Sequence, residues 1–137
     1  MSDEFQSPAP APKPKKILVV DDNADVAEGL RELLESAGHT AIVATGAVQA
    51  LALGSAVAPD VVISDIELPV MDGYELALHL RARPELSNCL FIALTGYGQA
   101  HDPRHSHESG FQYHLVKPVD IDRLLKIVAE GAGPQLP

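Results

Sequence analysis

Short apolar runs alternate with amphipathic stretches five times along this chain. The runs cover residues 16–22, 40–44, 61–65, 89–95 and 112–116. The third is an unbroken run, Val61-Val62-Ile63-Ser64-Asp65, rich in β-branched side chains. Such a run is typical of a strand that is buried on both faces of a parallel sheet. The alternation therefore predicts a parallel sheet that helices cover on both faces.

The order of these elements narrows the fold further. Right-handed crossovers leave few topologies for five parallel strands. We expect an α/β fold, in which a five-stranded parallel sheet with helices on both faces has the flavodoxin-like (βα)5 order 2-1-3-4-5. Open sheets of this kind place their ligands beside the carboxyl ends of the strands, so a functional site is expected at that edge.

Capping residues and apolar spacing predict where the helices begin, end and face. The first helix should end at Gly38, the second near Gly54 and the third at about residue 83, because a proline follows. The expected N-caps are Asn23, Thr45, Asp72 and Asp120. The residues expected to face the core are Val26, Leu30, Leu33, Leu34 and Ala37 in the first helix, Val48, Leu51 and Ala52 in the second, and Ile121, Leu124, Leu125 and Val128 in the last.

Composition divides the chain into one domain and two tails. Residues 1–15 hold prolines at four alternate positions, which neither a sheet nor a helix accepts, so we expect a flexible Pro-rich tail or linker. Residues 16–130 form the predicted domain, and residues 131–137 a flexible C-terminal end. Residues 97–109 have few apolar side chains and predict a short or mobile helix. His101 and His105 lie there at the i, i+4 spacing of metal ligands, but a solvated polar loop is the favoured interpretation.

The overall charge excludes several classes of function. The chain has 19 acidic and 10 basic residues and a formal net charge of −9. This charge argues against binding nucleic acid or anionic membranes through bulk electrostatics. The single cysteine, Cys89, cannot form an internal disulfide, and no apolar run approaches the roughly 20 residues of a membrane span. Because the N-terminus also has no apolar signal region, we expect a cytoplasmic protein.

Reactive side chains close four of the predicted strands or follow them directly. Asp21 and Asp22 close the first strand, Asp65 closes the third and Thr95 the fourth, and Lys117 follows the fifth. Taken singly, each of these residues also has an ordinary explanation; an aspartate could cap a helix, for example, and the lysine could be solvated. Together at one edge, the carboxylates would repel one another and need a cation. Oxygen ligands with several waters suit Mg²⁺, and a carboxylate beside it can attack phosphorus, so the hypothesis is a phospho-acceptor site at Asp65.

The same residues carry a resemblance to a known family. The chain resembles the receiver (CheY-like) domain of two-component response regulators over residues 16–130. The match lies in four motifs, each weak alone and specific together: Val20-Asp21-Asp22-Asn23, the run from Asp65 through Leu68-Pro69 to Met71-Asp72-Gly73, Ala93-Leu94-Thr95-Gly96, and Lys117-Pro118.

The resemblance implies a role for each matching position. Asp65 would accept the phosphoryl group, while Asp22 and Asp65 bind Mg²⁺ directly and Asp21 assists through water. Thr95 would turn toward the phosphoryl group and Lys117 would pair with it. The remaining positions are the backbone carbonyl of Glu67 as a metal ligand, His114 at a switch position and Pro118 after a cis peptide bond.

The resemblance also implies partners. A histidine kinase or histidine phosphotransferase would phosphorylate Asp65, docking near the first helix and the Lys117-Pro118 loop. Phosphorylation would then bias residues 95–109 between two arrangements and signal to a protein partner. No output domain is expected after the last helix, so the chain would be a stand-alone regulator, a phosphate shuttle, or a receiver cut from a hybrid kinase. It would not be an enzyme beyond catalysing its own phosphorylation and dephosphorylation.

Two alternatives remain open at this point. A haloacid-dehalogenase-like phosphohydrolase also uses an aspartyl nucleophile with Mg²⁺, but it usually has a second aspartate where this chain has Glu67. A flavodoxin-like FMN binder is less consistent with so acidic a site.

Some positions depart from the family pattern. His114 stands where the family often has tyrosine or phenylalanine, so partner binding is predicted to depend on pH. A solvated histidine without a signalling role is about equally compatible. In the family, the positions that match Glu67 and Tyr97 influence how long the phosphoryl group survives.

Overall fold

A parallel sheet of five strands forms the centre of the protein. The computed structural model describes residues 13–96 and 108–131. The strand order is β2-β1-β3-β4-β5, and every neighbouring pair is parallel, as the alternation predicted. The strands are β1 (Lys16–Val20), β2 (Thr40–Ala44), β3 (Val61–Asp65), β4 (Leu90–Thr95) and β5 (Tyr113–Val116).

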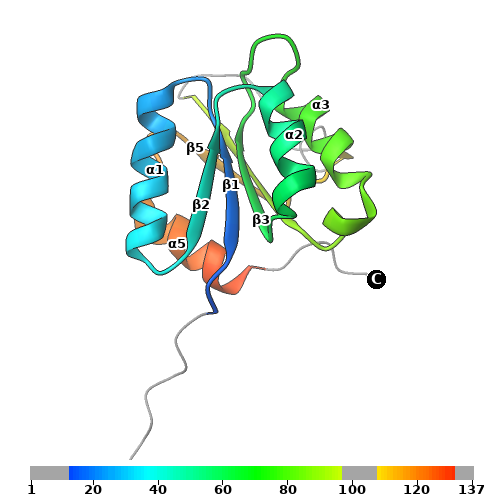
Figure 1. Ribbon diagram of the computed structural model, residues 1–137. Helices are drawn as coiled ribbons and strands as arrows, with labels where there is room; N and C mark the ends of the chain where they lie inside the picture. Colours follow the sequence, from blue (N-terminus) through cyan, green and yellow to red (C-terminus); the bar gives the residue numbers. More distant parts are fainter. Residues whose placement is uncertain (1–12, 97–107, 132–137) are drawn as a thin grey trace, which may run out of the picture.

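Helices cover both faces of this sheet (Figure 1). On one face α1 and α5 pack on the apolar side chains of β1, β3, β4 and β5, and on the other α2 and α3 pack on β1, β3 and β4. Because parallel strands buried on both faces read as continuous apolar runs, the three central strands are almost entirely buried. The helices are α1 (Ala24–Ser36), α2 (Ala47–Val57), α3 (Gly73–Arg81) and α5 (Ile121–Glu130), with a short 3-10 helix, η1 (Pro84–Leu86).

Side-chain caps fix the starts of three helices. Asn23 accepts hydrogen bonds from the backbone N–H groups of Asp25 and Val26, so the predicted cap of α1 is confirmed. Asp72 and Asp120 accept in the same way at α3 and α5. Gly38 follows α1 with φ +100°, a conformation that glycine adopts without strain.

The predicted cap and buried face of α2 were wrong. Gly46, not Thr45, is the N-cap, because the backbone N–H and the hydroxyl of Thr45 both donate to the Gln49 side chain. The helix continues past Gly54 to Val57. Its buried residues are Ala47, Ala50 and Gly54, whereas Val48 is 69% exposed, Ala52 is exposed and Leu51 is only partly buried.

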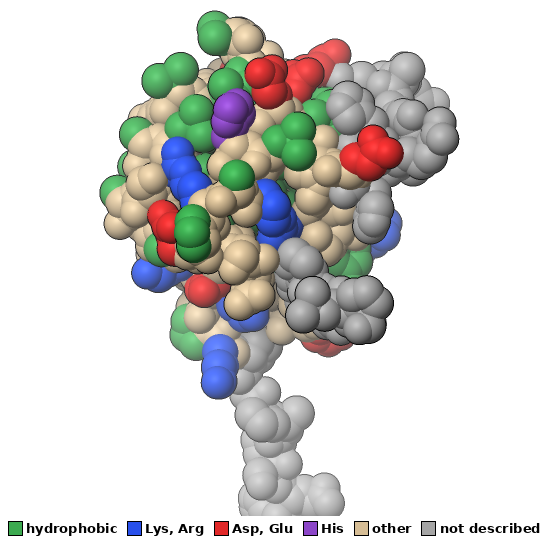
Figure 2. Space-filling model, turned by 90° about the vertical axis from the view of Figure 1, so that its right-hand side faces the viewer, with side chains coloured by type: hydrophobic (Ala, Val, Ile, Leu, Met, Phe, Trp, Pro, Cys, Tyr) green, Lys and Arg blue, Asp and Glu red, His purple; other side chains and the backbone are tan. Residues whose placement is uncertain are grey.

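The small residues Ala47, Ala50 and Gly54 explain why this face of α2 packs on the core. A Cβ added at Gly54 would lie 2.7 Å from Leu80 Cδ2, so a larger residue there would have to displace the buried Leu80 side chain. Because α2 is apolar almost all round, periodicity could not identify the face that packs. Figure 2 views the side that α2 and α3 form, where apolar side chains are scattered among polar ones, as is ordinary for a protein surface.

The face of α1 was predicted only in part. Leu30 and Leu34 are buried together with Ala27, but Val26 and Leu33 remain 38% and 42% exposed, and Ala37, also predicted to face the core, is exposed. The buried face of α1 is therefore rotated by about one residue from the predicted face, and Val26 and Leu33 lie along its edge. In α5, likewise, Leu124 and Val128 are buried with Ile127, while Ile121 and Leu125 are only partly buried.

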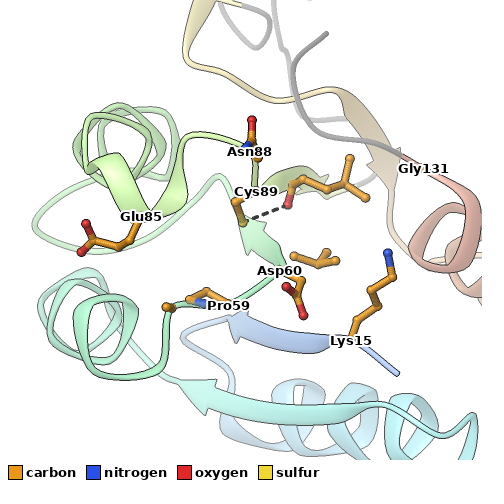
Figure 3. A pocket seen from close by; sticks show the side chains of 10 residues that line it. Lys15, Pro59, Asp60, Glu85, Asn88, Cys89 and Gly131 are labelled. Atoms are coloured by element: carbon orange, nitrogen blue, oxygen red, sulfur yellow. Dashed lines mark hydrogen bonds between the residues drawn. The ribbon is translucent and has the colours of Figure 1, made fainter. Parts of the chain in front are cut away.

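A hollow of about 380 Å³ lies at the amino-terminal ends of the strands, at the opposite end of the sheet from Asp65 (Figure 3). One of its polar side chains already serves the fold, because Asp60 accepts from the Lys16 backbone N–H at 2.8 Å. Cys89 is buried beside it, and burial raises the pKa of this thiol to about 12. A protonated, buried thiol is unreactive at neutral pH, so Cys89 is a core residue.

Among the described residues, no helix is long and apolar enough to cross a membrane.

Candidate functional site

Three strands deliver one ion-paired cluster to their carboxyl ends. The Lys117 ammonium donates to Asp21 Oδ2 and to Asp65 Oδ2, each at 2.9 Å. Asp21 follows β1, Asp65 closes β3 and Lys117 follows β5. These residues lie far apart in the sequence, and the parallel register brings them to one edge, where the pattern of strand ends predicted them.

The carboxylate of Asp65 is held in a defined orientation. Its side chain is only 8% exposed, and Oδ1 accepts the backbone N–H of Glu67 at 2.9 Å. The backbone behind it is fixed as well, because the Ser64 hydroxyl donates to the Asp65 carbonyl oxygen at 2.9 Å. A carboxylate oriented in this way presents its remaining lone pairs in a fixed direction.

Glycine at position 73 lets α3 begin against the back of this residue. A Cβ at Gly73 would lie 2.4 Å from the Asp65 carbonyl oxygen and 2.7 Å from Ile66 Cα. The Gly73 N–H donates to the Ile66 carbonyl oxygen at 2.8 Å. The sequence motif contains Gly73, but its role as the contact between α3 and Asp65 was missed, because only the tertiary structure shows how closely the two backbones approach.

Three carboxylates at this edge could hold a cation. Oxygens of Asp21, Asp22 and Asp65 all lie within 4.8 Å of one another. Asp21 is buried, with its Oδ1 held by the Asn23 backbone N–H at 2.9 Å, whereas Asp22 is exposed. Oxygen ligands at a site that is open on one side fit Mg²⁺, which keeps several of its waters.

Lys117 offsets the negative charge of the cluster. Burial acts to lower the pKa of its ammonium group, but the hydrogen bonds and the charges of Asp65 and Asp21 outweigh burial, so the net effect is a raised pKa. Lys117 therefore stays protonated at neutral pH and lies between two carboxylates that would otherwise repel each other.

The remaining predicted residues lie in β4, β5 and the loops that follow β3 and β5. Thr95 ends β4 and is buried, and its carbonyl oxygen accepts the Lys117 backbone N–H at 2.6 Å. Glu67 is exposed in the β3–α3 loop. The peptide bond between Lys117 and Pro118 is cis, as the resemblance implied. His114 lies in β5 opposite Ala93 of β4 and is partly buried, and the pH dependence proposed for it stays a prediction.

Tyr97, His101 and His105 lie outside the described residues, and so do the predictions made for them.

An apolar groove of about 500 Å³ lies beside the cluster, on the α1 face. The exposed side chains of Val26 and Leu33 line one wall, and the loop after β5, from Lys117 through Val119, lines the other. Val26 and Leu33, which were predicted to face the core, therefore form a surface that adjoins the charged site.

Comparison with known proteins identifies the family. The family model for the response regulator receiver domain matches residues 17–129. The chain belongs to this family. The receiver domain is therefore part of a two-component system, whose receiver domains interact with histidine kinases and downstream partners. The haloacid-dehalogenase alternative is not supported.

Relatives in sequence match the receiver domain over nearly their whole length. An uncharacterised 14.6 kDa protein from the sodA1 3′ region of Leptolyngbya boryana is 40% identical over 114 residues, covering 83% of this chain and 87% of that protein. The polar-differentiation response regulator DivK of Brucella anthropi is 28% identical over 120 residues, covering 88% of this chain and 98% of DivK.

Solved structures give the same result for the fold. A putative response regulator from Chloroflexus aurantiacus has a TM-score of 0.78 at 33% identity, covering 85% of this chain and 95% of that one. The chemotaxis response regulator CheY4 of Vibrio cholerae also has a TM-score of 0.78, at 28% identity, covering 85% and 97% of the two chains.

Proposed function

We propose that this receiver domain accepts a phosphoryl group on Asp65, with Mg²⁺ bound, from a histidine kinase or a histidine phosphotransferase. The observation that carries the proposal is the meeting of Asp65 with Asp21 and Lys117 at the carboxyl ends of three strands. A buried, oriented carboxylate with an ammonium group on one oxygen and two further carboxylates beside it is suited to nucleophilic attack on phosphorus.

Asp21, Asp22 and Asp65 would hold the metal, together with the backbone carbonyl of Glu67. When bound, Mg²⁺ supplies positive charge that offsets the charge on the phosphoryl oxygens. The separation of the three carboxylates, within 4.8 Å, supports this assignment, and so does the exposure of Asp22, which leaves room for water.

The chain's own residues would perform the transfer. An oxygen of Asp65 forms a bond to phosphorus while the bond between phosphorus and the donor's histidine nitrogen breaks. The electron pair stays on that nitrogen, and the product at Asp65 is an acyl phosphate. Lys117, which already donates to Asp65, pairs with the phosphoryl oxygens, and the Thr95 hydroxyl donates a further hydrogen bond to them.

The new charge would also start a switch. Thr95 moves toward the phosphoryl group and His114 responds on the neighbouring strand, so the surface presented to a downstream protein partner changes. The phosphodonor would dock in the apolar groove between α1 and the Lys117–Val119 loop, because an apolar surface next to the acceptor allows a protein to bind while it delivers its histidine. A cytoplasmic location belongs to the same proposal, because histidine kinases take their phosphoryl group from ATP.

The test is stoichiometric labelling by a small acyl phosphate. The purified chain is incubated with acetyl phosphate and MgCl₂, and its intact mass is measured. We expect one phosphoryl group per wild-type chain, none on Asp65→Asn, and full labelling of a control, Asp122→Asn, whose side chain is exposed on α5. Labelling that survives in Asp65→Asn would refute the assignment.

A second measurement separates the proposal from enzymatic turnover. We expect one labelling event and slow decay, without steady hydrolysis of a phosphate ester such as p-nitrophenyl phosphate. Continuous hydrolysis that depends on Asp65 would instead make the chain a phosphohydrolase.

A further inference from the structure

The β3–α3 loop contains a strained residue, Val70. Its φ is +74°, and the Met71 backbone N–H donates to the Pro69 carbonyl oxygen at 2.8 Å across it. Positive φ with a hydrogen bond from residue i+2 back to residue i is the rare, strained kind of γ-turn. A β-branched side chain is among the least suited to positive φ, which glycine, asparagine and aspartate adopt at lower cost.

The fold does not compensate for this strain through the side chain. Val70 is 96% exposed, so its apolar surface packs against almost nothing in the described part of the chain. Isolated exposed apolar residues are common, but this one combines exposure with an unfavourable backbone conformation. Neither the turn nor the core requires a valine here.

The position of the loop connects Val70 to the acceptor. The loop projects beyond the carboxyl end of the sheet (Figure 1). At one end the Glu67 N–H donates to Asp65 Oδ1, and at the other the Gly73 backbone lies against the Asp65 carbonyl. The loop leads into α3, which covers one face of the sheet, while the apolar groove lies beside α1 on the other face.

We propose that Val70 is an apolar contact for the protein that brings its phosphohistidine to Asp65, on the opposite side of the acceptor from the groove. This inference rests on the proposed function. A donor protein seated over Asp65 extends past the site on both sides, so it reaches the groove and the loop together. A small acyl phosphate has no protein surface that could contact Val70, and this difference makes the contact testable.

The experiment compares Val70→Asn with Val70→Ile in the full chain. Asparagine keeps the turn with less strain and removes the apolar surface, whereas isoleucine keeps both the β-branch and the surface. The donor is a histidine kinase, autophosphorylated with ATP, that phosphorylates the wild-type chain. We expect Val70→Asn to slow transfer from the kinase about fivefold, as loss of one apolar contact predicts, and Val70→Ile to match the wild type.

Further measurements exclude loss of stability, or damage to Asp65 itself, as the cause of slower transfer to Val70→Asn. Thermal unfolding of Val70→Asn should shift upward by about 3 °C, because strain is relieved. Labelling by acetyl phosphate should be equal in all variants. Val48→Asn, a matched change of an exposed valine on α2, should alter neither rate.

Each outcome of this experiment either supports or overturns the contact at Val70. Unchanged transfer from the kinase to Val70→Asn overturns the contact while leaving Asp65 as the acceptor. Equal losses with the kinase and with acetyl phosphate overturn it too, because the loop would then act on Asp65 itself. Failure of wild-type labelling by acetyl phosphate is different, because it removes the proposed function on which the contact rests.

Discussion

At the scale of single residues, the site depends most on the positive charge of Lys117. The Lys117 side chain is 27% exposed, and its ammonium group lies between the carboxylates of Asp21 and Asp65, whose side chains are 1% and 8% exposed. Without a cation at this place, two nearly buried carboxylates repel each other and lose a charge-assisted hydrogen bond each. Lys117 therefore stabilises the metal-free domain as well as serving the proposed transfer.

Replacing Lys117 tests whether it stabilises the metal-free domain. We expect Lys117→Met to lower the free energy of unfolding in EDTA by about 2 kcal/mol, since it leaves two buried carboxylates without their partner. Added MgCl₂ should restore more stability to this variant than to the wild type. Urea denaturation measures both effects, and Lys126→Met, at an exposed position on α5, is the control. Equal losses in the two variants would contradict the role given to Lys117.

His39 makes the stability depend on pH at the other end of the sheet. Its Nδ1 accepts the Lys15 backbone N–H at 3.0 Å, and the residue is 8% exposed. Burial, with a smaller contribution from the charge of Lys15, lowers the pKa of this imidazole from 6.5. The fold therefore favours neutral His39, so its contribution is complete above pH 6.5 and is lost as the pH falls through the lowered folded-state pKa.

Substitution by asparagine should remove this dependence. The new amide side chain in His39→Asn keeps an oxygen that can accept the Lys15 N–H but does not titrate. We expect the wild type to lose about 1 kcal/mol more stability than His39→Asn between pH 7 and pH 5. Chemical denaturation at each pH measures the difference. His79→Asn, at an exposed position on α3, should follow the wild type, and a His39→Asn curve parallel to the wild type would refute the proposed linkage.

At the scale of elements, the junction of β3 with α3 positions the acceptor. The helix begins with its backbone against Asp65, which is possible only because residue 73 has no Cβ. Asp72 caps the same turn through the Glu75 backbone N–H at 2.9 Å. The strand end and the helix start therefore form one rigid unit, from which the β3–α3 loop projects.

Alanine at this junction should disrupt both the fold and the site. A methyl group at Gly73 would overlap backbone atoms that cannot move aside, so we expect Gly73→Ala to cost about 2 kcal/mol or more and to reduce labelling of Asp65. Gly29→Ala is the matched control. Nothing lies within 4 Å of a Cβ there, in the middle of α1, so stability should rise by about 0.5–1 kcal/mol. A tolerated Gly73→Ala, with normal labelling, would contradict the close packing.

The helix caps could be predicted from local sequence, whereas the buried faces of α1 and α2 could be predicted only in part. Asn23, Asp72 and Asp120 were predictable as caps, because capping depends on residues that are close in sequence. Val48 was misplaced because α2 is apolar on nearly every side, so steric fit against Leu80 decided which face packs. Val26 and Leu33 were assigned to the core, yet they line the groove, since helical spacing does not say where a neighbouring element ends.

At the scale of the whole molecule, the acidic edge makes metal binding a stability effect. A cation that binds the folded chain and not the unfolded one stabilises it by mass action, about 2.7 kcal/mol at a concentration 100 times the dissociation constant. The net charge of −9 adds a long-range attraction for cations.

Magnesium should therefore raise the melting temperature of the wild-type chain. We expect the rise to disappear in Asp22→Asn, which removes the exposed ligand, and to persist in Asp122→Asn on α5. Differential scanning calorimetry in MgCl₂, against KCl of equal ionic strength, separates binding from screening. The same rise in KCl, or an unchanged rise in Asp22→Asn, would rule out these carboxylates as the metal site.

The sequence alone determined the number of strands, their parallel arrangement and the residues that end them, because apolar runs and amphipathic periods record local burial directly. It also indicated that Asp21, Asp65 and Lys117 belong together, since parallel strands bring their carboxyl ends to one edge. Only the tertiary structure decided the face of α2, the groove beside α1, the contact of Gly73 with Asp65 and the strained, exposed turn at Val70. Apart from the local turn at Val70, these features depend on distances between backbone segments that are separated in sequence, and no local pattern encodes such distances.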